Sequence, residues 1–228
     1  MSSIPGWHGK LPSLGDFASR RLPASFVEAW DSWLASGLLQ LREADPAGWL
    51  EAYLAAPSRR FLLMPGVLAG EDGHQAWAGV LMPSVDRVGR YFPFTVAQPL
   101  PALPAVQTQM QSLWSWLGRL DDLAADALHD DWGVEQLESE LHRLSCPDWL
   151  SMPSAEQAMP EGRGDVQTMP LARNGDIVQH LDLEAQALWA GHAQGLAYWY
   201  TRSAPQSPKL RVSRGLPASA AQFLSGAD

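Results

Sequence analysis

The sequence predicts an α/β (α+β) fold in which a mixed, mainly antiparallel central sheet is flanked by helices. Two apolar runs, residues 76–82 and 91–97, have the length and composition of buried strands. Longer stretches elsewhere carry apolar residues at helical spacing. Helical and strand-like stretches are intermixed, with hairpin-like neighbours, which favours this arrangement over a doubly wound parallel sheet. No internal repeat is visible, and we expect one domain over residues 1–228.

Composition narrows the class of protein. The apolar fraction of 46% and the charged fraction of 18% are those of an ordinary globular chain. Eleven tryptophans need a large core to cover them, unless some are exposed for a partner. The net charge of −9 disfavours general binding to nucleic acid or to an anionic membrane. With one cysteine, no secretory signal and no apolar run of membrane-spanning length, we expect a soluble cytoplasmic protein.

The first half of the chain opens with a segment rich in Gly and Pro, residues 6–25, that we expect to be irregular or short-stranded. Pro23 suits the first turn of a helix, and Asp45-Pro46 ends it. Between them an apolar stripe follows helical spacing: Phe26, Val27, Trp30, Trp33, Leu34, Leu38 and Leu41. The next expected elements are one or two helical turns over 49–56, a buried strand over 59–64 and a hairpin-like turn at 71–73.

The second half is expected to be more helical. Pro93 indicates that the 91–97 strand is bulged or lies partly at an edge. Amphipathic helices are predicted over 106–128, with Met110, Leu113, Trp114, Leu117, Leu120 and Leu128 inward, and over 134–144, with Glu135, Glu138, Glu140, His142 and Arg143 facing water. We expect a long, partly mobile loop over 151–176, followed by a strand or the start of a helix over 177–183. A strand is expected over 196–202, paired with residues 210–214, and a short helix after Leu216-Pro217.

Two polar clusters stand out as candidate binding or structural residues. The first is Asp16, Arg20 and Arg21, and the second, in the connection PSVDRVGR, is Ser84, Asp86, Arg87 and Arg90. One interpretation is that Asp–Arg pairs staple the N-terminal segment to this connection. The other is an arginine patch that docks a carboxylate, a phosphate or a partner backbone. We expect Asp16 or Asp31 to contact an arginine of residues 87–90, since a half-buried arginine needs a carboxylate.

Asp31 lies between two tryptophans at the edge of the apolar stripe of the first helix. An indole N–H or a nearby arginine is its expected partner.

Several catalytic and cofactor chemistries are disfavoured. Gly9-Lys10-Leu11 fails as a phosphate loop, because Ile4 stands where the first glycine is needed and Leu11 follows the lysine. His129 next to Asp130 and Asp131 is better explained as the solvated end of a helix than as a metal site. Ser84 and Asp86 have no histidine nearby in the sequence, and Cys146 has no paired ligand. We therefore expect no cofactor, no metal and no enzymatic activity.

Two long stretches resemble one family. Residues 6–34 read GWHGKLPSLGDFASRRLPASFVEAWDSWL and are similar to the opening signature of the TagF (ImpM or SciE) family of the bacterial type VI secretion system. Residues 79–96, GVLMPSVDRVGRYFPFTV, are similar to its second signature, and YWYTRS followed by GLP resembles its late strand and terminal helix. The polar positions that match are Lys10, Asp16, Arg20, Asp31, Ser84, Asp86, Arg87 and Arg90.

The resemblance implies an accessory regulator of type VI secretion. TagF-like proteins repress assembly after translation and are thought to bind a cytoplasmic forkhead-associated scaffold protein. No catalytic residue belongs to the family pattern, so the implied activity is binding. The alternative from the residues alone is an enzyme or small-ligand domain that uses the arginine cluster on an anionic substrate. A hollow lined by Arg20, Arg87 and Arg90 would favour that alternative.

Overall fold

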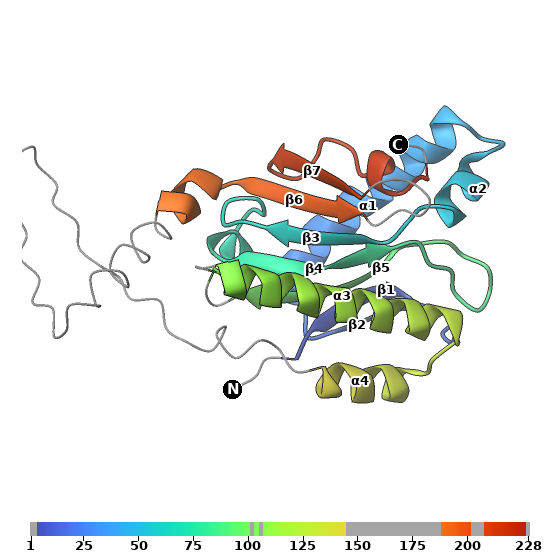
Figure 1. Ribbon diagram of the computed structural model, residues 1–228. Coiled ribbons are helices and arrows are strands. Elements are labelled where there is room, and N and C mark those ends of the chain that lie inside the picture. Colours follow the sequence, from blue (N-terminus) through green and yellow to red (C-terminus); the bar gives the residue numbers. More distant parts are fainter. Residues whose placement is uncertain (1–3, 101–102, 105–106, 145–187, 202–207, 227–228) are drawn as a thin grey trace, which may run out of the picture.

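The computed structural model describes residues 4–100, 103–104, 107–144, 188–201 and 208–226 (Figure 1). The predicted loop over 151–176, the predicted element over 177–183 and Cys146 lie outside these residues. No helix among them is long and apolar enough to cross a membrane.

A seven-stranded sheet, ordered β2-β1-β5-β4-β3-β6-β7, forms the centre of the molecule. Every pairing in it is antiparallel, which confirms the predicted class of sheet. The strands are β1 (Gly6–Lys10), β2 (Phe17–Arg20), β3 (Arg59–Leu63), β4 (Ala76–Met82), β5 (Phe94–Leu100), β6 (Leu196–Thr201) and β7 (Lys209–Arg214). The edges are β2 and β7, and β4 lies at the centre.

The central strand β4 has the bounds expected from the sequence, whereas the prediction for β5 was shifted by three residues. Tyr91 makes only an isolated bridge with Val85, and the strand begins after Pro93, at Phe94. Pro93 is therefore neither in a bulge nor in a strand; it stands immediately before β5. The strand instead continues through Pro99, beyond the Gly6–Ala97 pair where β1 begins, so that proline sits where β1 no longer flanks β5.

Helices cover both faces of the sheet (Figure 1). On one face lie α1 (Ala24–Ala44) and α2 (Trp49–Leu54), and on the other α3 (Gln107–His129) and α4 (Val134–Arg143). The turn expected at 71–73 is a short 3-10 helix, η1 (Glu71–His74), and the final helix is also a 3-10 turn, η3 (Ala221–Phe223). Residues 188–193 are helical as well.

The apolar stripe of α1 builds the core on its face of the sheet. Trp30 is fully buried among Phe26, Phe61 and Trp199, and its indole N–H donates to Thr95 Oγ1 at 2.9 Å. Burial of one side of the helix against the sheet is what the 3.6-residue period of the stripe predicts. Tryptophan thus supplies much of the core, and five indoles are under 2% exposed: Trp7, Trp30, Trp77, Trp116 and Trp199.

The core on the α3 face departs from the prediction at several positions. Trp116 is fully buried, whereas Trp114, which the pattern placed inward, is only half-buried. Glu138 of α4 does not simply face water: its carboxylate accepts hydrogen bonds from the indole of Trp7 at 2.6 Å and from Arg21. Burial alone would raise the pKa of Glu138, but these bonds lower it. The partners are 131 and 117 residues away, beyond the reach of a helical pattern.

Candidate functional site

Two connections meet at one end of the sheet and bring the two family-like stretches together. Because β1 pairs with β5, the turn of residues 11–16 after β1 lies beside the connection of residues 83–93 before β5. The Arg87 backbone N–H donates to Leu14 C=O at 2.8 Å, and the Arg90 guanidinium donates to Gly15 C=O. We call residues 10–20 and 83–93 together the rim.

Close packing of the two backbones depends on Gly9. It has a φ of +130°, and a Cβ added there would lie 2.1 Å from Pro93 C=O. Only glycine combines that backbone angle with that approach. The rim is therefore anchored in the sheet by a contact that any side chain would prevent.

Asp86 is the centre of the rim. Its Oδ1 accepts from the backbone N–H groups of Val88 at 3.0 Å and Arg90 at 2.9 Å, and its Oδ2 accepts from Lys10 Nζ at 2.6 Å and Arg90 Nε at 2.8 Å. Lys10 and Asp86 are 3% exposed each. Burial by itself would raise the pKa of Asp86, but the hydrogen bonds from Lys10, Arg90 and Val88 hold it well below its usual range. Asp86 is therefore a charged organiser of the connection, not a proton donor.

Ser84 anchors the same connection through buried hydrogen bonds. Its hydroxyl donates to Lys10 C=O at 2.7 Å, its N–H donates to Tyr53 Oη at 2.8 Å, and Tyr53 Oη donates back to Ser84 C=O at 2.9 Å. Burial raises the pKa of Tyr53 far above its usual value, so the hydroxyl stays protonated. Since Ser84 is buried and its hydroxyl is committed to a backbone carbonyl, its role here is structural.

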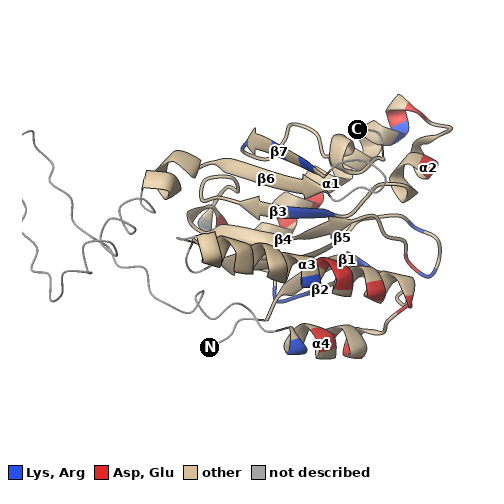
Figure 2. Cartoon of the chain, viewed as in Figure 1, with Lys and Arg blue, Asp and Glu red and all other residues tan. Residues whose placement is uncertain are grey.

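The outer surface of the rim is partly apolar. Val88, at the tip of the connection, is 63% exposed, and Phe17, the first residue of β2, is 47% exposed. The Phe17 ring packs edge-on against Phe92 at 4.9 Å and lies 4.2 Å below Lys10 Nζ. Basic and acidic residues both occur along this connection (Figure 2). Aromatic side chains such as Phe17 are enriched in the cores of protein–protein interfaces.

The predicted aspartate–arginine contacts are only partly present. Asp16 lies 3.9 Å from the Arg90 guanidinium, with both side chains more than half exposed. Such a pair contributes little, about 0–1 kcal/mol. The strong partner of Arg90 is Asp86, four residues earlier in the chain.

Asp31 was wrongly assigned to an indole or an arginine. Its carboxylate meets His8 Nε2 at 3.2 Å, and the neighbouring indoles of Trp30 and Trp33 donate to Thr95 and to Pro217 C=O. His8 in turn stacks on Phe17, with ring centroids 6.0 Å apart, so Asp31 supports the rim from α1. The sequence contains no signal for this pair, since it joins β1 to α1 through the fold.

The remaining predicted residues, Arg20 and Arg87, are both exposed, but Arg20 pairs with Trp7 at the far end of β2 from Phe17. Shallow depressions of the described surface lie elsewhere: one of about 500 Å³ is beside Arg60, Trp114 and Gly118, and another of about 680 Å³ is beside Gly66, His192 and Arg214. Neither is lined by Arg20, Arg87 or Arg90. Over the described residues, which include 129–131, no group of three or more His, Cys, Asp or Glu side chains is placed to hold a metal.

Comparison with known proteins identifies the family. A family model described as the TagF N-terminal domain, type VI secretion system-associated, matches residues 6–144. The chain belongs to the TagF family. That membership associates it with an accessory role in type VI secretion. The whole rim lies within the part of the chain that matches the TagF model.

A solved structure extends the likeness beyond that match. The crystal structure of PA0076 from Pseudomonas aeruginosa PAO1 is 36% identical to this chain, with a TM-score of 0.71. The alignment covers 98% of this chain and 95% of PA0076. A comparison with curated proteins finds no match.

Proposed function

We propose that this TagF-family chain represses type VI secretion after translation. It does so in the bacterial cytoplasm by binding a forkhead-associated scaffold protein and keeping that protein from promoting assembly. Family membership supports the secretion role. The observation that carries the binding role is the rim, in which Phe17 and Val88 are exposed on a support fixed by the buried Lys10–Asp86 pair.

A preformed surface suits a protein that acts by binding. Ordering loops and side chains on association costs free energy, roughly 0.5–1.5 kcal/mol for each flexible side chain. In the rim the carboxylate of Asp86 already fixes two backbone N–H groups, and Arg87 is bonded to the opposite turn. The rim exposes both Arg87 and Phe17, and arginine and aromatic residues are enriched among interface hot spots.

The small-ligand alternative receives less support. It needs a hollow lined by the arginines of the rim, whereas the depressions described above for the visible part of the chain lie beside other residues. Ser84, the hydroxyl closest to Asp86 in the sequence, is buried and bonded to a carbonyl. Exposed apolar side chains at this surface favour a macromolecular partner.

The proposal predicts how repression depends on concentration. Binding by mass action means that extra chain silences secretion and extra scaffold restores it. The two proteins are titrated against each other in cells, and export of a secreted tube subunit is measured. Repression that persists at a large excess of scaffold would show that sequestration is the wrong mechanism.

A matched pair of variants tests the rim. Val88→Asp places a charge on the proposed contact, and Leu39→Asp places one on an exposed leucine of α1, which is 55% exposed compared with 63% for Val88. We expect Val88→Asp to lose scaffold binding and repression, whereas Leu39→Asp retains both. Equal behaviour of the two variants would remove the rim as the binding surface.

A further inference from the structure

Strand β7 is the edge strand of the sheet on the side opposite to β2 (Figure 1). Over the described residues it pairs with β6 alone. A strand at an edge carries a row of backbone groups available for another strand, and proteins normally shield such edges. This strand has six residues, Lys209–Arg214, with no proline among them.

The hydrogen-bonding pattern shows which backbone groups face outward. Gly215 N–H donates to Gly195 C=O at 2.7 Å, immediately beyond the Leu196–Arg214 pair. Bonded and non-bonded pairs alternate along an antiparallel ladder. Lys209, Arg211 and Ser213 therefore bond to β6, and the N–H and C=O groups of Leu210, Val212 and Arg214 point away from it.

Two of the three β7 side chains on the α3 face of this edge are apolar, and the third is Arg214. Leu210 and Val212 are 59% and 52% exposed, and they stand opposite Tyr200 and Tyr198 of β6. Tyr200 packs edge-on against Trp114 of α3, with centroids 5.7 Å apart, which fixes the side of the sheet to which this row belongs. An edge strand that faced only water would place polar residues at these positions.

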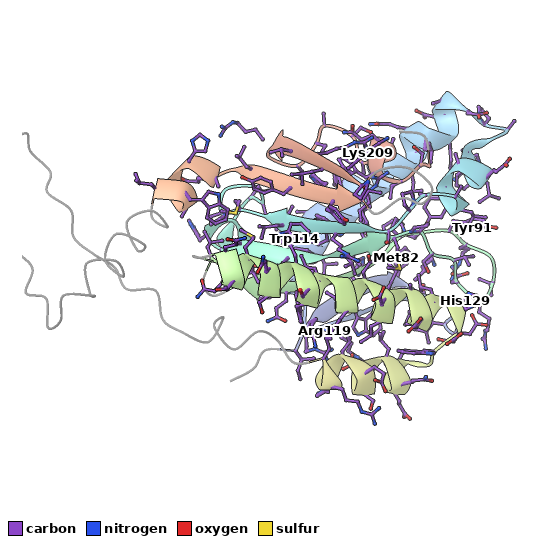
Figure 3. The ribbon with its side chains drawn as sticks, viewed as in Figure 1. Met82, Tyr91, Trp114, Arg119, His129 and Lys209 are labelled. Atoms are coloured by element: carbon purple, nitrogen blue, oxygen red, sulfur yellow. The ribbon has the colours of Figure 1, made fainter. Side chains whose placement is uncertain are left out.

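The charged side chains of β7 are all basic. They are Lys209, Arg211 and Arg214, in a chain whose net charge is −9 (Figure 3 labels Lys209). Pairing with a second copy of β7 would bring three cations of one strand beside three of the other, and like charges opposed across a ladder are destabilising. The charge of the strand favours an acidic partner strand instead.

We propose that β7 docks an extended acidic segment of a partner protein, which adds to the sheet as a further strand. The main-chain groups of Leu210, Val212 and Arg214 supply the hydrogen bonds. Because side chains alternate between faces, the segment carries Asp or Glu on the face of Lys209 and Arg211 and apolar residues on the face of Leu210 and Val212. This surface is separate from the rim and does not depend on the partner proposed for the rim.

The test uses the full chain and two capped synthetic peptides, one alternating Glu with Val and the other alternating Lys with Val. We expect the Glu peptide to bind and to shift the amide NMR signals of Leu210, Val212 and Arg214, with the Lys peptide binding at least about ten-fold more weakly. The double variant Lys209→Glu, Arg211→Glu should reverse this preference. Thermal melts of every variant check that it is folded.

Proline supplies a test of the backbone contact. Val212→Pro removes an outward-facing N–H and leaves the bonds to β6, so we expect a folded protein that binds the Glu peptide at least about ten-fold more weakly. Val212→Thr keeps the N–H and should bind as the wild type does. Failure of the Glu peptide to bind, equal binding of both peptides, or unchanged binding by Val212→Pro would each overturn the proposal. A wild-type dimer in sedimentation that Val212→Pro dissociates would also overturn it, in favour of a second copy at this edge.

Discussion

The hydroxyl of Tyr53 tests whether the rim is held by its buried hydrogen bonds. Tyr53→Phe keeps the ring and its packing against Tyr91 but leaves the buried Ser84 N–H without its acceptor. The Ser84 carbonyl keeps a second donor, the N–H of Phe92 at 3.1 Å, so the cost comes mainly from one orphaned donor. An unsatisfied buried donor costs about 1–3 kcal/mol. We therefore expect the free energy of unfolding to fall by about 2 kcal/mol.

Urea unfolding and thermal melts measure this loss. The midpoint temperature should fall by about 4–8 °C, since a chain of this size loses about 2–4 °C for each kcal/mol. Hydrogen exchange of the Ser84 amide should also become faster, because its bond to Tyr53 is gone.

Tyr91→Phe is the matched control. Tyr91 lies at the end of the same connection (Figure 3), and its hydroxyl makes no hydrogen bond with a described residue. Its removal should change the free energy of unfolding by less than about 0.5 kcal/mol. If Tyr53→Phe and Tyr91→Phe unfold alike, the Tyr53–Ser84 pair does not hold the rim, and the account of its rigidity is wrong.

Two further predictions concern stability. Asp86→Asn leaves Lys10 buried without its counter-charge and should destabilise the protein at neutral pH. In the wild type, the stabilisation from Asp86 is complete above the unfolded carboxyl pKa of about 4. It is lost as the pH falls toward the lower pKa of the folded state. The free energy of unfolding of the variant should therefore fall less steeply than that of the wild type as the pH is lowered. Gly37→Ala places a Cβ 2.4 Å from Ala220 Cβ and 2.8 Å from Ala221 N. Overpacking costs about 1–3 kcal/mol and the helix gains about 1 from alanine, so calorimetry should show a net loss; a rise in melting temperature would contradict the tight α1–η3 contact.

Local patterns in the sequence determined most of the elements. The bounds of the strand at 76–82 could be predicted because all seven of its positions are buried, and buried positions take only apolar or small residues there. The stripe of α1 is visible for a similar reason, since one helical face meets one core. The ends of β5 were less predictable. Whether a proline stops a strand or is accepted in it depends on the neighbouring strands, and these differ at Pro93 and Pro99.

The resemblance of two stretches of sequence to the TagF family also indicated the secretion role. It named the residues of the rim but not their connections. Lys10 and Asp86 are separated by 76 residues, and the sequence alone does not show that the Asp86 carboxylate accepts hydrogen bonds from both Lys10 and Arg90. The prediction was that Asp16 or Asp31 contacts an arginine of residues 87–90; Asp16 does lie 3.9 Å from Arg90, but in water, and the closer carboxylate is Asp86.

Only the tertiary structure decided which charges are buried together and which surfaces stay open. Burial depends on all the elements that pack around a group, whereas periodicity reports only the face that one element presents. Asp31 therefore contacts His8 instead of an indole, and Glu138, on a helix face predicted to be exposed to solvent, accepts a hydrogen bond from Trp7. For the same reason Leu210 and Val212, which have the composition of a buried strand, lie exposed: β7 is the last strand of the sheet, and chain position alone does not reveal an edge.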